Sequence, residues 1–284
     1  MSNDFLVELL SPERLTHVVD VGANPIEGDP PYKKMLQTGL CKVTGFEPQA
    51  SALTELNLKK GERETYLPYA LGSGKESLLN ICQYSGWTSL FKPRAEALNV
   101  FSQFKSNAKV VETTTVQTRR LDDINELNDF DFLKIDIQGG ELDVFMGGVH
   151  HLEKAVAIQT EVSFITLYEH QPSFGVIDLT LRKMGFVPHC FSHVKTWPVG
   201  PLQFHPDMHN KFNQLLEADV VYVKDFVDPV AMSDEQLKHL CLLMHHCYGS
   251  IDLSGRCLEL LEQRGVISNG IVRYVQYLNS SVKS

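Results

Sequence analysis

The chain alternates apolar runs of strand length with segments of helical period through most of its 284 residues. This alternation is typical of an α/β fold, in which helices connect the strands of a mainly parallel sheet. It predicts seven strands, near residues 17–21, 42–46, 65–70, 131–136, 155–162, 186–191 and 219–224. Between residues 72 and 130 the pattern is less regular, and it predicts a short strand, a long loop and a further strand or hairpin arm.

The first predicted strand runs directly into a glycine turn, Asp20-Val21-Gly22-Ala23-Asn24. Glycine has no Cβ, so a ligand or another stretch of backbone can approach closely at Gly22. Only Gly28 stands nearby, and the three-glycine fingerprint of pyrophosphate binders is absent. The turn therefore predicts a nucleotide-type pocket but disfavours a dinucleotide.

Polar groups also follow the next predicted strands. The second strand ends in Glu47, whose carboxylate can accept hydrogen bonds from both hydroxyls of a ribose. The third delivers Ala70 and Leu71, where a backbone amide and an apolar edge suit an adenine. The fourth ends in Asp136, followed by Gln138. Carboxyl ends of parallel strands meet at one edge of a sheet, so these groups predict a site for an adenosine-containing ligand there.

From Ser233 onward only helical periods remain. Ser233 and Gln236 have the spacing of a capping box at the start of the first helix, and two further helices centre on Leu260 and Val275. We expect a main domain over residues 1–228 and a small C-terminal helical appendage over 229–284.

Composition narrows the classes of partner. The formal net charge is -9 and the basic clusters are short, so we expect no nucleic-acid partner. No window approaches the length of a membrane span, and the N-terminus lacks the basic and apolar regions of an export signal, which favours a cytoplasmic protein. Oligomeric state cannot be predicted from these features.

Two histidine-containing segments invite functional interpretations. The run CLLMHHC could suggest zinc, but on a helix Cys241 and His245 share a face that Cys247 does not, which favours packing of the cysteines and solvation of one histidine. The second segment lies between the sixth and seventh strands and contributes a candidate general base near its natural pKa. Its histidines are His189, His193, His205 and His209.

Several motifs occur in order over roughly residues 15–225: VVDVGAN, GFEPQ, LKIDIQGGE and IQTEVSFITLYEHQPSF, followed by LRKMGF and EADVVYVKD. Together they resemble the FkbM-type methyltransferases, which use S-adenosylmethionine. The resemblance implies a class I methyltransferase fold, a Rossmann-like sheet of six parallel strands with an antiparallel seventh. It also implies methylation of a hydroxyl on a sugar, glycan or small natural product.

The resemblance further implies which residues contact the cofactor. They are Asp20, Gly22 and Asn24 around its methionine end, Glu47 at the ribose, Ala70 with Leu71 near the adenine, and Asp136 with Gln138 facing the sulfonium or the acceptor. The chain departs from many family members by placing Pro25-Ile26-Glu27 before Gly28, and by its C-terminal helices.

The tetrapeptide Asp29-Pro30-Pro31-Tyr32 is spelled like the catalytic loop of enzymes that methylate amino groups. Such a loop should follow the fourth strand, where this chain has Asp136-Ile137-Gln138 instead. We interpret the tetrapeptide as a helix start, with Asp29 as the N-cap and Pro30 as the first helical residue.

The sulfonium already activates the methyl group, so the protein mainly aligns a hydroxyl and removes its proton. Candidate catalytic residues are Asp136 and His193, and Asp136 with Glu161 could instead hold Mg²⁺ through oxygen ligands. Aromatic side chains could either stack on an acceptor or pack in the core; these are Trp87, Phe91, Tyr168 and Trp197. A nicotinamide-dependent oxidoreductase and a non-catalytic adenosine-binding module are the alternative functions.

Overall fold

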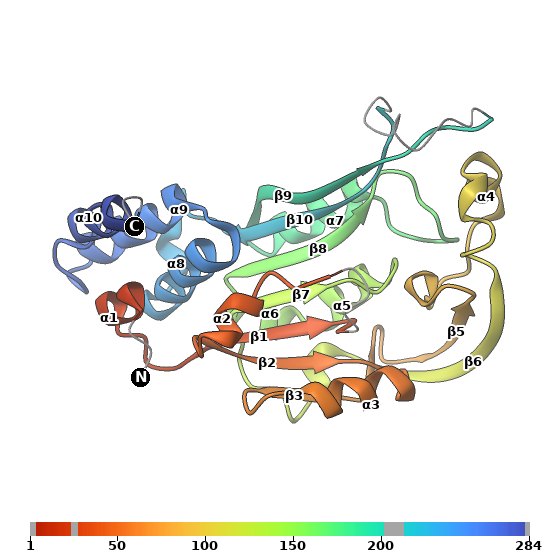
Figure 1. Cartoon of the computed structure of the whole chain (residues 1–284), viewed down its shortest axis with the longest axis horizontal. Helices are drawn as coiled ribbons and strands as arrows, with labels where there is room; N and C mark the ends of the chain where they lie inside the picture. The colour runs from red at the N-terminus through yellow and green to blue at the C-terminus, as the bar shows by residue number, and fades with distance from the viewer. Residues whose placement is uncertain (1–3, 24–27, 202–212, 282–284) are drawn as a thin grey trace.

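A computed structural model describes residues 4–23, 28–201 and 213–281. Its centre is a seven-stranded sheet with the order β3-β2-β1-β7-β8-β10-β9 (Figure 1). The strands are β1 Thr16–Val21, β2 Cys41–Phe46, β3 Glu64–Leu67, β7 Phe132–Ile135, β8 Ala157–Ser163, β9 Phe186–Thr196 and β10 Leu215–Lys224. All neighbours are parallel except β10, which runs antiparallel to both β8 and β9. The predicted mainly parallel sheet with an antiparallel last strand is confirmed.

The third predicted strand, at residues 65–70, is divided in the structure. Pro68 has no N–H for a strand ladder, and β3 stops at Leu67. Ala70 and Leu71 form a separate strand, β4, in a second sheet of order β4-β6-β5. Strands β5 Glu76–Cys82 and β6 Val110–Arg119 are antiparallel to each other and supply the arm expected in the irregular region.

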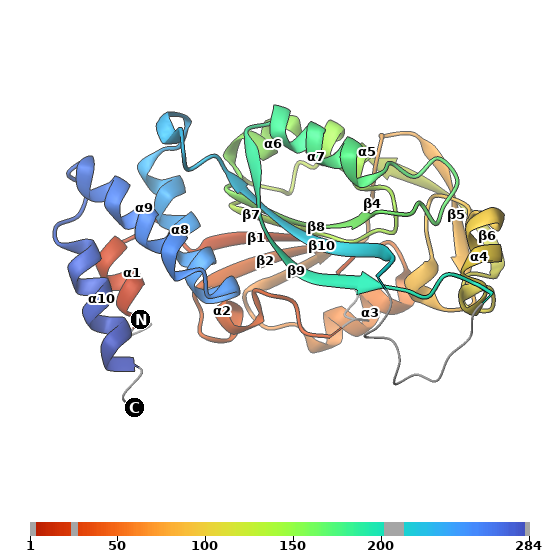
Figure 2. The ribbon, with the colours of Figure 1, turned by 90° about the horizontal axis from the view of Figure 1, so that it is seen from above.

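Helices cover both faces of the main sheet. The structure contains α1 Phe5–Leu10, α2 Lys33–Gln37, α3 Ala50–Lys59, α4 Ala95–Val100, α5 Glu141–Gly147, α6 Val149–Lys154, α7 Phe174–Lys183, α8 Asp234–Tyr248, α9 Ile251–Gln263 and α10 Gly270–Ser281. Figure 2 shows α5, α6 and α7 along one face. There Phe145 and Leu181 pack with Leu133 of β7 in one hydrophobic core.

The predicted helix start at Asp29 is wrong, because α2 begins at Lys33. Pro31 disfavours the helical conformation at Pro30, so the chain makes a turn there before the helix begins. Asp29 forms an ion pair with Lys33 instead of capping the helix.

The opposite face of the sheet packs against the C-terminal helices near the amino ends of the strands. Leu237 and Leu240 of α8 share a buried cluster with Val18 and Phe132 of the sheet. Helices α9 and α10 lie beyond α8, beside α1 (Figure 1). The division at residue 228 stays a prediction, and the structure adds that α8 belongs to the same hydrophobic core as the strands. Among the described residues, no helix has the length and apolar character needed to cross a membrane.

The predicted capping box at the start of α8 is confirmed. Gln236 N–H donates to Ser233 Oγ at 3.2 Å, and Ser233 N–H donates to Gln236 Oε1 at 2.9 Å. We expect Ser233→Ala to lower the free energy of unfolding by about 1 kcal/mol, because one helix N–H loses its partner. Urea denaturation measures the change. Ser280→Ala, which alters an exposed hydroxyl of α10, is the control, and an equal loss in both variants would contradict the capping role.

Candidate active site

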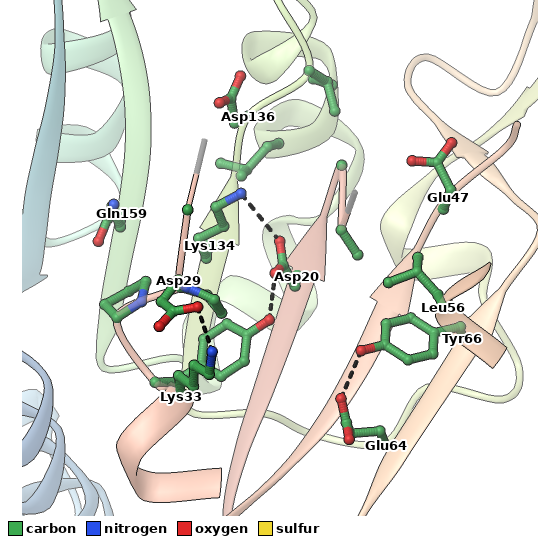
Figure 3. Close-up of a pocket in the computed structure, with 18 of the residues that line it drawn as sticks. Asp20, Asp29, Lys33, Glu47, Leu56, Glu64, Tyr66, Lys134, Asp136 and Gln159 are labelled. Atoms are coloured by element: carbon green, nitrogen blue, oxygen red, sulfur yellow. Dashed lines mark hydrogen bonds and ion pairs between the residues drawn. The ribbon is translucent and has the colours of Figure 1, made fainter. Parts of the chain in front are cut away.

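A cavity of about 1160 Å³ lies at the carboxyl edge of β1, β2 and β7 and extends over one face of the sheet. Every described residue expected to contact the cofactor lines it. These residues are Asp20, Gly22, Glu47, Ala70, Leu71, Asp136 and Gln138. Figure 3 shows Asp20, Glu47 and Asp136 among them. Asn24 lies outside the described residues. The loop after β5 contributes Ser85, Gly86 and residues 88–90 to the wall.

Gly22 occupies a turn that accepts no side chain. Its φ is 80°, and an added Cβ would lie 2.1 Å from the backbone oxygen of Asp136. Hydrogen bonds hold this contact in place: Gly22 N–H donates to Phe46 O at 3.1 Å, and Asp136 N–H donates to Val21 O at 3.0 Å. The ends of β1, β2 and β7 therefore converge on one point of the cavity.

Asp20 is buried at the base of the cavity and interacts with two partners (Figure 3). Its Oδ2 accepts a hydrogen bond from the Tyr32 hydroxyl, and its Oδ1 lies 3.5 Å from Lys134 Nζ. Burial, followed by the charge of Asp20, raises the pKa of Tyr32, so the phenol stays a donor. Tyr32, the last residue of the Asp29-Pro30-Pro31-Tyr32 tetrapeptide, thus orients the Asp20 carboxylate in the cavity.

Glu47 stands at the end of β2 and is only 3% exposed. Its Oε1 accepts a hydrogen bond from Gln49 N–H at 2.8 Å. Burial raises its pKa, the Gln49 N–H opposes that rise, and the nearby charge of Asp20 adds to it. Both acids line the same cavity (Figure 3).

Asp136 and Glu161 are bridged by an amide rather than arranged as a metal site. Gln138 Nε2 donates to Asp136 Oδ1 at 2.8 Å and to Glu161 Oε2 at 3.0 Å, while the Tyr168 hydroxyl donates to Gln138 Oε1 at 3.0 Å. Lys195 Nζ lies 3.3 Å from Glu161 Oε1. Burial, followed by the charge of a neighbouring glutamate, raises the pKa of Glu161.

These contacts do not support the candidate Mg²⁺ site. Amide and ammonium donors already occupy oxygens of Asp136 and Glu161 that would have to turn to a cation. Within residues 4–23, 28–201 and 213–281 there is also no group of three or more acidic, histidine or cysteine side chains that could hold a metal ion.

Glu141 supports the loop that carries Gln138. Its Oε1 accepts from the backbone N–H groups of Ile137 and Gly139, at 3.0 and 3.1 Å. Burial raises the pKa of Glu141 to about 7, against the effect of these two hydrogen bonds. Glu141 is not among the predicted site residues, because its backbone contacts depend on the path of the loop.

Polar side chains on the sheet face beside Asp20 were not predicted. Lys134, Gln159 and Asp219 line the cavity, and each stands two positions from an apolar residue of the core beneath α8. Those apolar residues are Phe132, Ala157 and Val221. Because alternate residues of a strand share a face, a period of two that changes from apolar to polar was the available signal. Tyr248 of α8 donates to Gln159 Oε1 at 2.9 Å and marks the boundary between core and cavity.

The four candidate histidines were expected between the sixth and seventh strands, but His189 and His193 lie within β9 itself. His193 lines the cavity, next to Lys195 in the wall from β9. His189 lies elsewhere, with its Nε2 2.7 Å from Ser250 Oγ between α8 and α9. His205 and His209 lie outside the described residues. Of the histidines that the structure describes, His193 is therefore the one that lines the cavity.

The CLLMHHC segment and the four candidate aromatic side chains contribute to packing between elements of the fold and do not line the cavity. Cys241 is buried, His245 Nδ1 lies 2.8 Å from the Tyr274 hydroxyl, and Cys247 Sγ lies 3.5 Å from Met35 Sδ. The packing interpretation is supported for the cysteines, but the expected solvated histidine is wrong, because His245 packs against Tyr274 and the His246 side chain is only 9% exposed beside Asp4. The four candidate stacking residues also pack together or beside one another rather than lining the cavity; they are Trp87, Phe91, Tyr168 and Trp197.

The sheet order and the cavity at its carboxyl edge define a class I methyltransferase architecture. A model of the methyltransferase FkbM domain matches residues 20–188, which is more than half of the chain. The chain belongs to the FkbM family of methyltransferases, which use S-adenosylmethionine.

Comparisons with other proteins add distant likenesses. Magnesium protoporphyrin IX methyltransferase (ChlM) from Synechocystis PCC 6803, solved with bound S-adenosylmethionine, is 11% identical over 78% of this chain and 76% of that chain, with a TM-score of 0.38. A putative tRNA methyltransferase from Streptococcus pneumoniae, in complex with S-adenosylmethionine, is 14% identical over 97% and 99%, with a TM-score of 0.35. A comparison with curated proteins finds no match.

Proposed function

We propose that this protein transfers the methyl group of S-adenosylmethionine to a hydroxyl of a sugar, a glycan or a small natural product. The observation that carries the proposal is the convergence, in one cavity, of the strand-end residues that the family pattern assigns to the cofactor. A domain-sized fold alone would not require acids at the ends of three strands.

In this proposal the cofactor lies along the carboxyl edge of the sheet. Glu47 accepts hydrogen bonds from the ribose hydroxyls, and Ala70 with Leu71 flanks the adenine. Gly22 leaves room for the sulfur-bearing chain between β1 and β7. The methyl group then points toward Asp136 and the sheet face beyond it.

The acceptor lies over that polar sheet face. A hydroxyl acceptor needs hydrogen-bonding groups to hold it in line with the sulfonium, and the face offers the Gln159 amide and the His193 imidazole. Asp136 or His193 accepts the hydroxyl proton as the methyl group moves. Glu161 is a positioning residue, because it holds Gln138 and Lys195 and does not itself line the cavity.

Calorimetric titration with S-adenosylhomocysteine, NAD and buffer alone tests the cofactor. We expect heat from S-adenosylhomocysteine only, and heat from NAD alone would replace the proposal with an oxidoreductase. Incubation with S-adenosylmethionine and a panel of glycosides and polyols, followed by mass spectrometry, tests the acceptor. Methyl transfer to amines and not to hydroxyls would contradict O-methylation.

Glu47→Gln is expected to weaken S-adenosylhomocysteine binding about tenfold. The amide keeps the acceptor for Gln49 N–H but replaces a charged acceptor for the ribose hydroxyls by a neutral one. Calorimetry measures the change. Glu64→Gln is the matched control and should keep its affinity. Both carboxylate oxygens of Glu64 already accept hydrogen bonds within the protein, from Gly61 N–H and from the Tyr66 hydroxyl. Equal affinities of the Glu47 variant and the unaltered protein would contradict the ribose assignment.

A further inference from the structure

Asp20 and Lys134 form a long ion pair at the base of the cavity. Asp20 and Lys134 are direct neighbours on β1 and β7, and their side chains share one face of the sheet. Asp20 Oδ1 is buried and has no hydrogen-bond partner among the described residues. Lys134 Nζ lies 3.5 Å from it, beyond the usual 2.7–3.2 Å of an N–H···O hydrogen bond.

Neighbouring side chains fix the orientation of Asp20 and the charge of Lys134. The Tyr32 hydroxyl occupies Asp20 Oδ2 and leaves Oδ1 for another donor. Burial works against the charge of Lys134, but the carboxylates of Asp20, Asp136 and Asp219 outweigh it and hold its pKa above the usual value. Lys134 is therefore a cation, and its side chain is 20% exposed toward the cavity.

Buried polar groups nearly always have hydrogen-bond partners, so Asp20 Oδ1 indicates a ligand that supplies a donor. An ammonium group has three N–H donors, so Lys134 can also donate to an acceptor of the same ligand beside its ion pair with Asp20. The position of the pair limits the choice. Asp20 stands two residues before Gly22, and Lys134 stands two residues before Asp136. Both therefore lie beneath the point where the ends of β1 and β7 meet.

The family resemblance already places Asp20 at the methionine end of the cofactor, where its Oδ1 faces the α-ammonium group. We propose that Lys134, beside it, binds the α-carboxylate of the same methionine moiety. This inference rests on the proposed function and adds a carboxylate-binding residue to it. An α-amino acid is a zwitterion, so its ammonium matches the carboxylate oxygen Asp20 Oδ1 and its carboxylate matches the Lys134 ammonium. The excess of acids around Lys134 also suits S-adenosylmethionine, which carries a sulfonium and an ammonium against one carboxylate.

Three ligands separate the contacts: S-adenosylhomocysteine, its decarboxylated analogue S-adenosyl-3-thiopropylamine, and 5′-methylthioadenosine, which has neither group. We expect Lys134→Met to weaken S-adenosylhomocysteine at least tenfold by calorimetry and to change the other two less than twofold. Asp20→Asn should weaken both amines and leave 5′-methylthioadenosine unchanged. Lys92→Met, which alters an exposed lysine paired with Glu169 away from the cavity, is the control.

Lys134→Met leaves Asp20 without its counter-ion, so the variant could fail to fold. The charge-balanced double variant Asp20→Asn/Lys134→Met then replaces it, and we expect it to bind S-adenosylhomocysteine no more tightly than 5′-methylthioadenosine. Two results would overturn this inference and leave the proposed function in place: unchanged affinity of the Lys134 variant for S-adenosylhomocysteine, or an equal loss of affinity for all three ligands. Absence of binding of all three ligands by the unaltered protein would overturn the proposed function as well.

Discussion

Gly22→Ala is expected to abolish S-adenosylhomocysteine binding and to lower the free energy of unfolding by about 3 kcal/mol. Alanine in the left-handed region costs about 1–2 kcal/mol, and forced overpacking adds about 1–3 kcal/mol. The new Cβ would lie 2.1 Å from the Asp136 backbone oxygen, and no side-chain rotation can relieve a collision with backbone. The ends of β1 and β7 must separate, which disrupts the floor of the cavity.

Urea denaturation and calorimetry measure the two effects of this substitution. Gly175→Ala is the matched control, because Gly175 lies in α7 with no atom within 4 Å of its added Cβ. We expect that variant to keep both its stability and its affinity. A Gly22 variant that binds S-adenosylhomocysteine as tightly as the unaltered protein would show that the turn lies outside the cofactor site.

The sequence predicted the strands of the sheet well because buried strands of an α/β fold appear as short hydrophobic runs that alternate with helical segments. The strands it placed at 17–21 and 42–46 correspond to β1 and β2 within one residue. The prediction failed where a proline interrupts a hydrophobic or helical pattern. Pro68 separates β3 from β4, and Pro31 delays α2 until Lys33.

The site was predictable only where its residues follow strands directly. Glu47 and Asp136 stand at strand ends, and parallel strands bring such ends together. Tyr32 is different, because its contact with Asp20 depends on the path of the chain between β1 and α2. Glu141 is similar, because its hydrogen bonds close a loop of its own. Neither contact follows from a period of two or 3.6 residues.

The structure changes the interpretation of Asp20. In the sequence it is one acid near a glycine turn, whereas in the structure it is an oriented acceptor beside a cation. Tyr32 supplies the orientation, so the tetrapeptide that resembles an amino-methylating loop contributes to the cavity through its tyrosine. The carboxyl end of β7, where such a loop would have to act, holds Asp136 and Gln138 instead.

Glu141→Gln is expected to flatten the pH dependence of stability between about pH 4.5 and 7. The pKa of Glu141 is raised from 4.5 to about 7 in the folded protein, so over this range the folded chain holds a proton that the unfolded chain has released. The contribution of Glu141 to stability is therefore greatest below about pH 4.5 and is lost as the pH rises through 7. At 1.36 kcal/mol for each pKa unit, the loss amounts to about 3 kcal/mol at most.

Urea denaturation near pH 5 and near pH 8 measures the loss in both proteins. Glu47 and Glu161 also have raised pKa values, but both are present in the variant, so the difference between the proteins isolates Glu141. Glu112→Gln, at an exposed position of β6, is the control and should keep the full pH dependence. If Glu141→Gln kept the same slope, the carboxyl group would have to be equally solvated in the folded and unfolded chains, which is incompatible with its burial against Ile137 and Gly139.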